Sequence, residues 1–165
     1  MRLPICELCA KSGLLCPNCE RQLSENRISA LDVEMSKLIA SMSDRYGLDA
    51  ADFFKAVDTG RIILLLTKGD VGLLIGKQGC VVKNLTAELG KKVRIVEVSG
   101  DAHKTVSDII TPARLLGINT IFKPGGKGYR VRISRRDIER LPMDLETLNR
   151  ALATLLEVET AVTFE

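Results

Sequence analysis

The 165-residue sequence contains no tryptophan, one histidine and only six aromatic residues. So few aromatic side chains argue against recognition through an aromatic stacking platform of the kind found in RRM modules. The single histidine, His103, lies in a mostly polar segment, so a Ser-His-Asp triad has no support. No pair of carboxylates forms a catalytic motif either, and we therefore expect a protein that is not an enzyme.

Long hydrophobic runs are also missing. The longest, at residues 62–66 and 73–75, fall well short of the roughly 18 residues that a membrane helix needs. The first six residues, Met-Arg-Leu-Pro-Ile-Cys, contain no apolar signal region. We therefore expect a soluble, cytoplasmic protein with no membrane partner. In such a reducing compartment, cysteines are expected to serve as metal ligands in preference to forming disulfides.

Charge is unevenly distributed, although the net charge is only +3. Residues 104–140 contain nine lysines and arginines against three acidic residues, whereas residues 141–165 contain one against five and residues 30–60 three against six. A basic centre between acidic flanks favours a surface that faces a polyanion. Scattered solubilising charge is the alternative.

The first 28 residues have too little apolar material for a core but contain two Cys-x-x-Cys pairs, Cys6 with Cys9 and Cys16 with Cys19. Each pair can wrap one edge of a metal ion, and two pairs complete the tetrahedral sulfur shell that Zn²⁺ prefers. Four protein ligands leave no open position, so the pattern predicts one structural Zn²⁺ in a small knuckle. Disulfides, an iron centre and redox chemistry are the alternatives. Cys80 lies too far along the chain to be a ligand. We expect it to serve as a small apolar residue in the first turn of a helix.

Hydrophobic periodicity beyond residue 30 predicts an α+β fold in which one order of elements occurs twice. Each copy consists of a helix, two strands, a short helix, a second helix and a last strand. This order suggests an internal duplication, and a chance match of short elements is the alternative. The predicted domains are a knuckle at 1–28 and two units at 30–99 and 100–165. The first copy is expected at 31–46, 53–57, 61–67, a short helix ending at 75, 80–89 and 93–98; the second at 101 to 115–117, 118–122, 129–134, 135–140, 145–156 and 158–164, with a Gly-rich turn at 123–128.

The motif Gly76-Lys77-Gln78-Gly79 lies between two predicted helices of the first copy. The glycines permit a tight turn without Cβ atoms, Lys77 adds a cation, and the following helix offers free N–H groups to a phosphate. The motif predicts a grip on a sugar-phosphate backbone, beside a groove lined by apolar residues. A structural turn is one alternative. The other, a P-loop, would need Gly at 71 and Ser or Thr at 78, where Val71 and Gln78 stand.

With its surroundings, VGLLIGKQGCVVKNLTAELGKKVRIVEV, this loop resembles that of the KH domain, in which G-x-x-G clamps about four nucleotides of single-stranded nucleic acid. The helix and strand placed before it are similar to the type II variant. The second copy departs from the pattern, because Leu141-Pro142-Met143-Asp144 takes the position of the loop. This copy is expected to be a degenerate KH-like unit that contacts phosphates through Arg130 and Arg132, for which a merely solvated sheet face is the alternative.

The chain after about residue 30 resembles the tandem KH module of the archaeal NusA-like proteins, with an added four-cysteine knuckle. The resemblance implies a single-stranded RNA-binding factor in transcription elongation and termination, with RNA polymerase as its partner. A ribosome-associated or ribosome-assembly RNA-binding protein is one alternative, and an adaptor whose knuckle docks a protein is another. The candidate RNA-binding residues are Gly76, Lys77, Gln78, Gly79, Lys83, Arg130 and Arg132.

Overall fold

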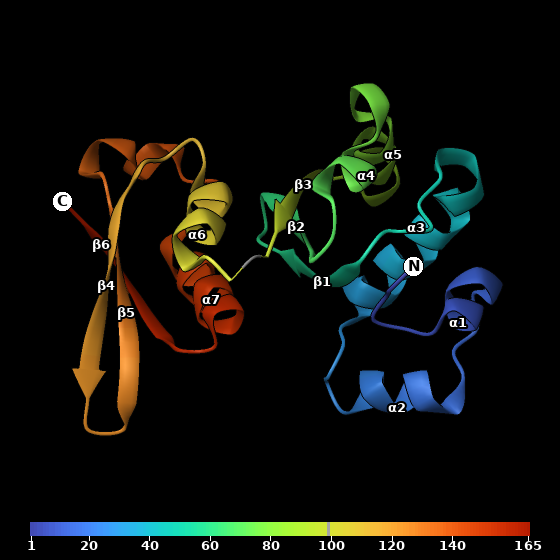
Figure 1. The fold of residues 1–165 in the computed structure, drawn as a ribbon, viewed down its shortest axis with the longest axis horizontal. Helices are drawn as coiled ribbons and strands as arrows, with labels where there is room; N and C mark the ends of the chain where they lie inside the picture. Colours follow the sequence, from blue (N-terminus) through green and yellow to red (C-terminus); the bar gives the residue numbers. More distant parts are fainter. Residues whose placement is uncertain (99) are drawn as a thin grey trace. The chain divides into compact units, whose positions relative to one another are not determined.

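The computed structural model describes residues 1–98 and 100–165, which form two compact units (Figure 1). Unit 1 holds residues 1–58 and 63–98, and unit 2 holds residues 59–62 and 100–165 of those described. Each unit combines helices with a three-stranded sheet. The predicted α+β class is therefore confirmed.

Unit 1 begins with two short helices, α1 (Glu7–Ser12) and α2 (Pro17–Ser24), which each start directly after a cysteine. Neither helix was predicted, because six to eight residues are too short for a hydrophobic period to show. Helix α1 lies against α3 (Ala30–Tyr46). The knuckle thus shares a small core with α3, formed by Ile5, Cys9, Ala10, Cys19, Val33 and Ala40.

The start of α3 is joined to the sheet by a buried carboxylate. Ser29 and Asp32 form a capping box, in which each side chain accepts the backbone N–H of the other residue. The second oxygen of Asp32, a residue only 2% exposed, accepts the N–H of Ala56 at 2.7 Å. Ala56 belongs to strand β1 (Phe53–Asp58), so one side chain fixes the helix against its neighbouring strand.

The sheet of unit 1 has the order β1-β2-β3, with β2 at Ile62–Thr67 and β3 at Lys92–Glu97. Strands β1 and β2 are antiparallel. Between β2 and β3 the chain forms α4 (Val71–Ile75), a 3₁₀ turn (Lys77–Gly79) and α5 (Cys80–Leu89). Residues from helices and strands meet in one core, which includes Met35, Ile39, Leu48, Phe53, Ile63, Leu65, Leu74, Val81, Leu85 and Val93.

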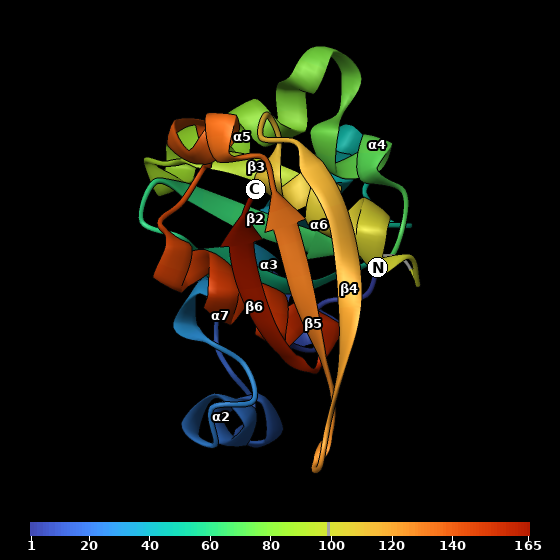
Figure 2. The same cartoon turned by 90° about the vertical axis from the view of Figure 1, so that its left-hand side faces the viewer.

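Unit 2 repeats the element order of unit 1, as predicted. It contains a sheet of order β4-β5-β6 in which β4 and β5 are antiparallel and β5 and β6 parallel. Helices α6 and α7 cover one face of this sheet (Figures 1 and 2). The elements are α6 (Ala102–Ile110), β4 (Leu115–Lys123), β5 (Gly126–Ile133), the 3₁₀ segment Arg135–Arg140, α7 (Leu145–Leu156) and β6 (Glu159–Phe164).

Two boundaries in unit 2 differ from the prediction. Helix α6 ends at Ile110 and not near residues 115–117, because Thr111 precedes Pro112 and takes an extended conformation with ψ of 133°. Strand β4 continues to Lys123 and β5 begins at Gly126, so the hairpin is longer and its turn tighter than predicted. None of the helices in the described part of the chain has the length and hydrophobicity that crossing a bilayer requires.

The 3₁₀ segment of unit 2 is held by Asp137, which is only 1% exposed. Its carboxylate accepts the backbone N–H and the Nε–H of Arg114 at 3.0 and 3.1 Å, and Arg140 Nη1 lies 3.5 Å away. The side-chain hydrogen bond from Arg114 lowers the pKa of Asp137 below its usual value.

Asp137→Asn is expected to lower the stability of unit 2 at neutral pH. A depressed pKa in the folded state contributes stability above the unfolded value of about 4, and that contribution is lost as pH falls through the folded pKa. The gap in urea midpoint between the parent and the variant should therefore shrink below about pH 4. Glu139→Gln, at an exposed position in the same segment, is the control. A gap that stays constant down to pH 2 would contradict this role of the carboxylate.

Candidate nucleic-acid interface and metal site

The motif at residues 76–79 forms a tight turn between α4 and α5. Three of its four residues have positive φ angles: 79° at Gly76, 55° at Gln78 and 74° at Gly79. Glycine takes this conformation without steric cost, whereas Gln78 takes it against its own preference. The turn therefore has a defined and locally strained backbone, with the side chains of Lys77 and Gln78 exposed at its tip.

The two glycines are required for different reasons. A Cβ atom at Gly76 would lie 2.7 Å from Val81 Cγ2 and 3.0 Å from the Val81 nitrogen, so the turn packs against the first turn of α5 too closely for any side chain. A Cβ atom at Gly79 would meet nothing nearer than 3.7 Å. Gly76 is therefore needed for its packing as well as its backbone conformation, and Gly79 for its backbone conformation alone.

Three polar side chains are exposed on and beside the turn: Lys77, Gln78 and Lys83. The Cε atom of Lys83 lies 3.7 Å from where a Cβ of Gly79 would be, which places this lysine against the turn. Not all of the expected N–H groups are free, because those of Gly79 and Cys80 donate to carbonyls within the turn. The two lysines therefore supply most of the attraction that this turn can offer to a phosphate.

The apolar groove expected beside the turn is largely filled. Leu74, Val81 and Val93 are buried in the core of unit 1. Of the large apolar side chains in residues 71–98, Ile75 is the one that is exposed, at 38%. The flanking helices and strand therefore offer a narrower apolar surface than the sequence predicts.

The corresponding loop of unit 2 is closed. Leu141 and Met143 are buried, and Asp144 caps α7 by accepting the N–H of Thr147 at 2.7 Å. That hydrogen bond lowers the pKa of Asp144, so the carboxylate is held in its charged form. A negative charge at the start of α7 opposes the approach of a phosphate.

Arg130 and Arg132 lie in unit 2, on the face of β5 opposite the buried Val131 and Ile133. They differ in their surroundings. Arg130 is exposed, whereas Arg132 lies across Gly117 and its Nη1 is 3.2 Å from Glu165 Oε2. Arg130 is thus the better placed of the two to contact a phosphate.

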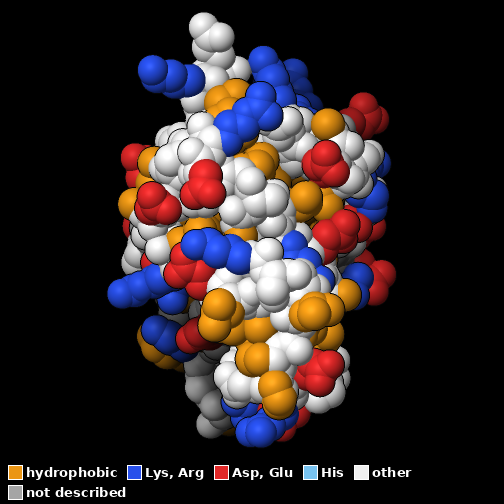
Figure 3. All heavy atoms as spheres, turned by 90° about the vertical axis from the view of Figure 1, so that its right-hand side faces the viewer, with side chains coloured by type: hydrophobic (Ala, Val, Ile, Leu, Met, Phe, Trp, Pro, Cys, Tyr) orange, Lys and Arg blue, Asp and Glu red, His pale blue; other side chains and the backbone are white. Residues whose placement is uncertain are grey.

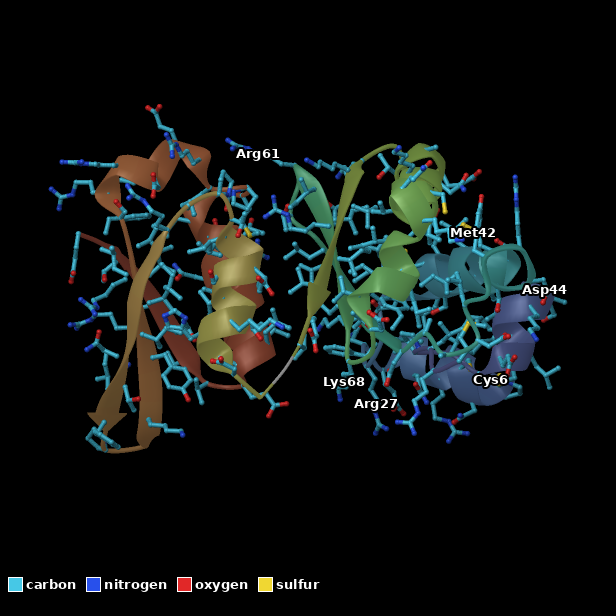
Figure 4. All side chains as sticks on the ribbon, turned by 45° about the horizontal axis from the view of Figure 1, so that its top comes forward. Cys6, Arg27, Met42, Asp44, Arg61 and Lys68 are labelled. Carbon is cyan, nitrogen blue, oxygen red and sulfur yellow. The ribbon has the colours of Figure 1, made fainter. Side chains whose placement is uncertain are left out.

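The four cysteines predicted as ligands lie together in unit 1, with Cys6 at the start of α1 (Figure 4). Their sulfur atoms all lie within 4.8 Å of one another, close to the roughly 3.8 Å spacing around a tetrahedral Zn²⁺ with 2.3 Å bonds. The backbone N–H of Cys16 donates to Cys9 Sγ at 3.1 Å, and that of Cys6 to Cys19 Sγ at 3.4 Å. The clustering is confirmed, and the donor set fits a metal ion.

The four thiols differ in acidity in the absence of a metal ion. A hydrogen bond with Cys6 raises the pKa of Cys9 to about 12, and burial raises the pKa of Cys19. The N–H of Cys19 lowers the pKa of Cys16 to about 7. Without a metal ion, Cys9 and Cys19 therefore stay protonated, and a bound cation would favour the thiolate form of all four.

The knuckle exposes apolar side chains that the sequence analysis did not single out. Leu8 is 81% exposed and Leu14 78%. Leu15, Pro17 and Leu23 line a shallow hollow on α2. In Figure 3, hydrophobic side chains gather in the lower part of the view, where α1 and α2 lie. The sequence could have predicted the exposure of Leu8, because this residue lies between Cys6 and Cys9, whose side chains both point into the cluster.

Fold and site together define an α+β protein with two copies of one element order, an exposed basic turn and a cysteine cluster that can hold a metal ion. No family model matches the chain. A solved structure described as the crystal structure of APE1850 covers 78% of this chain and 96% of that chain, with a TM-score of 0.55. At 22% sequence identity, this structural similarity shows a shared fold alone.

Two curated relatives are similar over part of the chain, and both are named probable transcription termination protein NusA. The protein of Methanococcus vannielii is 29% identical over 89 residues, which are 54% of this chain and 49% of that protein. The protein of Methanocaldococcus jannaschii is 42% identical over 55 residues, 33% of this chain and 30% of that protein. The matched part of the chain thus spans half or less of the length of these relatives.

Proposed function

We propose that the protein binds single-stranded RNA through the turn at residues 76–79 and acts as a binding factor, not as an enzyme. The observation that carries this proposal is the strained Gly-Lys-Gln-Gly turn between two helices, with Lys77 at its tip and Lys83 beside it. Gly79, which has no Cβ atom, lies between these two cations and leaves room for a sugar-phosphate chain. We propose that unit 1, which contains this turn, has the type II KH fold and that unit 2 is a degenerate KH-like copy.

We also propose that the cysteine cluster holds one structural Zn²⁺. Four sulfur ligands and tetrahedral spacing favour zinc over the oxygen-preferring cations, and no ligand position remains for a substrate. Cys6, Cys9, Cys16 and Cys19 would hold the ion, whose charge would compensate the thiolates. In this role zinc stabilises the knuckle and takes no part in a reaction.

The names of the two curated relatives support a place in transcription termination, with nascent RNA and RNA polymerase as partners in the cytoplasm. A ribosome-associated RNA-binding protein is the alternative. Crosslinking the bound RNA in cells and sequencing it separates the two, because one predicts nascent transcripts and the other ribosomal RNA.

The RNA proposal is tested by titrating a single-stranded oligoribonucleotide at several salt concentrations. We expect binding whose affinity falls as salt rises, with a slope that loses about 0.7 for each phosphate contact removed. Arg130→Gln should reduce the slope by about that amount. Arg132→Gln should reduce it less, because Arg132 already pairs with Glu165. Equal slopes in the parent and Arg130→Gln would show that this sheet face does not contact RNA.

The exposed leucines of the knuckle favour a second candidate function, the docking of a protein partner. Leu8 and Leu14 are more than three-quarters exposed, next to a rigid metal shell. In this role, replacing both leucines with lysine would remove a protein partner and leave RNA affinity unchanged. The RNA-binding role predicts no partner that depends on these leucines.

A further inference from the structure

The hairpin of β4 and β5 ends in an exposed aromatic ring. Phe122 is 85% exposed, more than any other large hydrophobic side chain in the described residues. The hairpin extends past helices α6 and α7 of its own unit (Figure 1), so its tip has no helix of that unit beside it. An exposed phenylalanine side chain forgoes the stabilisation that burial would give it, which makes this position a candidate binding site.

Phe122 belongs to a row of side chains on one face of the hairpin. In the strand register it lies opposite Lys127, and Thr120 lies opposite Tyr129. Residues at alternate positions of paired strands share a face, so Phe122, Lys127 and Tyr129 line the same side. The Nζ atom of Lys127 is 5.9 Å from the centre of the Tyr129 ring. Lys127 thus lies over one aromatic ring and is the register partner of another.

The segment that contains this row is rich in basic residues. Residues 114–136 contain seven lysines and arginines and no acidic residue. Lys123 is paired with Glu159 at 2.8 Å, whereas Lys127 forms no ion pair within residues 1–98 and 100–165. Arg130, also without an ion pair in these residues, lies on the opposite face of the hairpin. The tip therefore attracts a polyanion and carries an apolar ring that a base can cover.

We infer that the hairpin tip is a second RNA contact, at which Phe122 stacks on an unpaired base and Lys127 contacts the adjoining phosphate. This inference rests on the proposed RNA-binding function and extends it to unit 2. The combination of an aromatic ring with a neighbouring cation that forms no ion pair is that of single-strand binding surfaces. The core of a protein interface, in contrast, is depleted in lysine.

The absence of tryptophan gives a direct test. Phe122→Trp introduces the only indole of the chain at a surface position, and a mixed-sequence single-stranded RNA should quench its fluorescence while the affinity is retained. Phe122→Ala should lower affinity between about 5- and 150-fold, the range for loss of one stacked base. Phe122→Leu should lose nearly as much, because leucine is apolar but cannot stack. Leu116→Ala, at a 46% exposed position of the same strand, is the control and should stay within twofold.

Each outcome bears on the inference separately from the proposed function. If Phe122→Ala binds RNA like the parent, or if Phe122→Leu restores full affinity, base stacking at the tip is wrong while binding at residues 76–79 stands. If the tryptophan of Phe122→Trp stays unquenched when the protein is saturated with RNA, base stacking at the tip is also wrong. The ring would then be expected to bind in a pocket of a protein partner. If the parent binds no single-stranded RNA, both proposals fail.

Discussion

Replacing Lys77 and Gln78 with aspartate is expected to reduce the affinity for single-stranded RNA at least about 30-fold, or about 2 kcal/mol. The double variant puts two negative charges at the tip of the turn, where the phosphates of the bound strand would lie. Both glycines are kept, because a Cβ atom at Gly76 would lie 2.7 Å from Val81 and disturb the packing. Aspartate also tolerates the positive φ of Gln78. Fluorescence anisotropy with a labelled RNA measures the loss.

The control for this variant reverses one lysine charge elsewhere in the unit, which supplies two of the three charge units that the double variant changes. Lys37→Asp replaces a lysine on α3 that lines a hollow with α1 residues, away from the turn. It should change RNA affinity less than about threefold, through the general field alone. Thermal unfolding of both variants should match the parent. Equal losses in the two variants would mean that net charge, and not the turn, determines binding.

Cys16→Ser is expected to remove the metal ion and destabilise unit 1. The purified parent should contain about one zinc per chain, since a complete sulfur shell binds with roughly 10–16 kcal/mol in small zinc domains. Losing even several kcal/mol in a chain of this size would lower the melting temperature by about 10 °C or more. The effect should reach beyond the knuckle, because Cys9 and Cys19 share a core with Val33 and Ala40 of α3. Elemental analysis and calorimetry measure the two effects.

Cys80→Ser is the matched control, because Cys80 lies outside the four-cysteine cluster. It should keep both the zinc and the melting temperature. A Cys16→Ser variant that retains a full equivalent of zinc would exclude the four-sulfur site. Iron in place of zinc in the parent would confirm the ligands and correct the metal.

The sequence predicts the order of elements well, because apolar residues recur at the spacing of helices and strands. It also predicts the cysteine cluster, since two Cys-x-x-Cys pairs ten residues apart are close enough to meet whatever the rest of the chain does. The end of α6 was misplaced because the apolar pattern continues through Ala113, whereas Pro112 decides the boundary. Local sequence patterns thus predict the type of a helix or strand better than the residues at which it ends.

Other features depend on contacts that no local pattern contains. Arg130 and Arg132 have the same position in the alternating pattern of their strand. What distinguishes them is the ion pair of Arg132 with Glu165, which is 33 residues away along the chain. The need for glycine at residue 76 comes from Val81, which the turn brings within reach. The sequence also directs attention away from Phe122, because a shortage of aromatic residues excludes a stacking platform but not a single exposed ring.

The N-terminal residues pair with the edge of the unit 1 sheet where β1 begins. Strand β1 is at an edge of its sheet, and Arg2 pairs alongside the start of it: its N–H donates to Ala51 O at 2.9 Å, and its carbonyl accepts the N–H of Phe53 at 3.0 Å. An unpaired edge strand is a template for another chain. Arg2 is only four residues from Cys6, so disruption of the cysteine cluster is expected to loosen this pairing and expose the start of β1. We therefore expect the Cys16→Ser variant to aggregate through β1 before it unfolds completely.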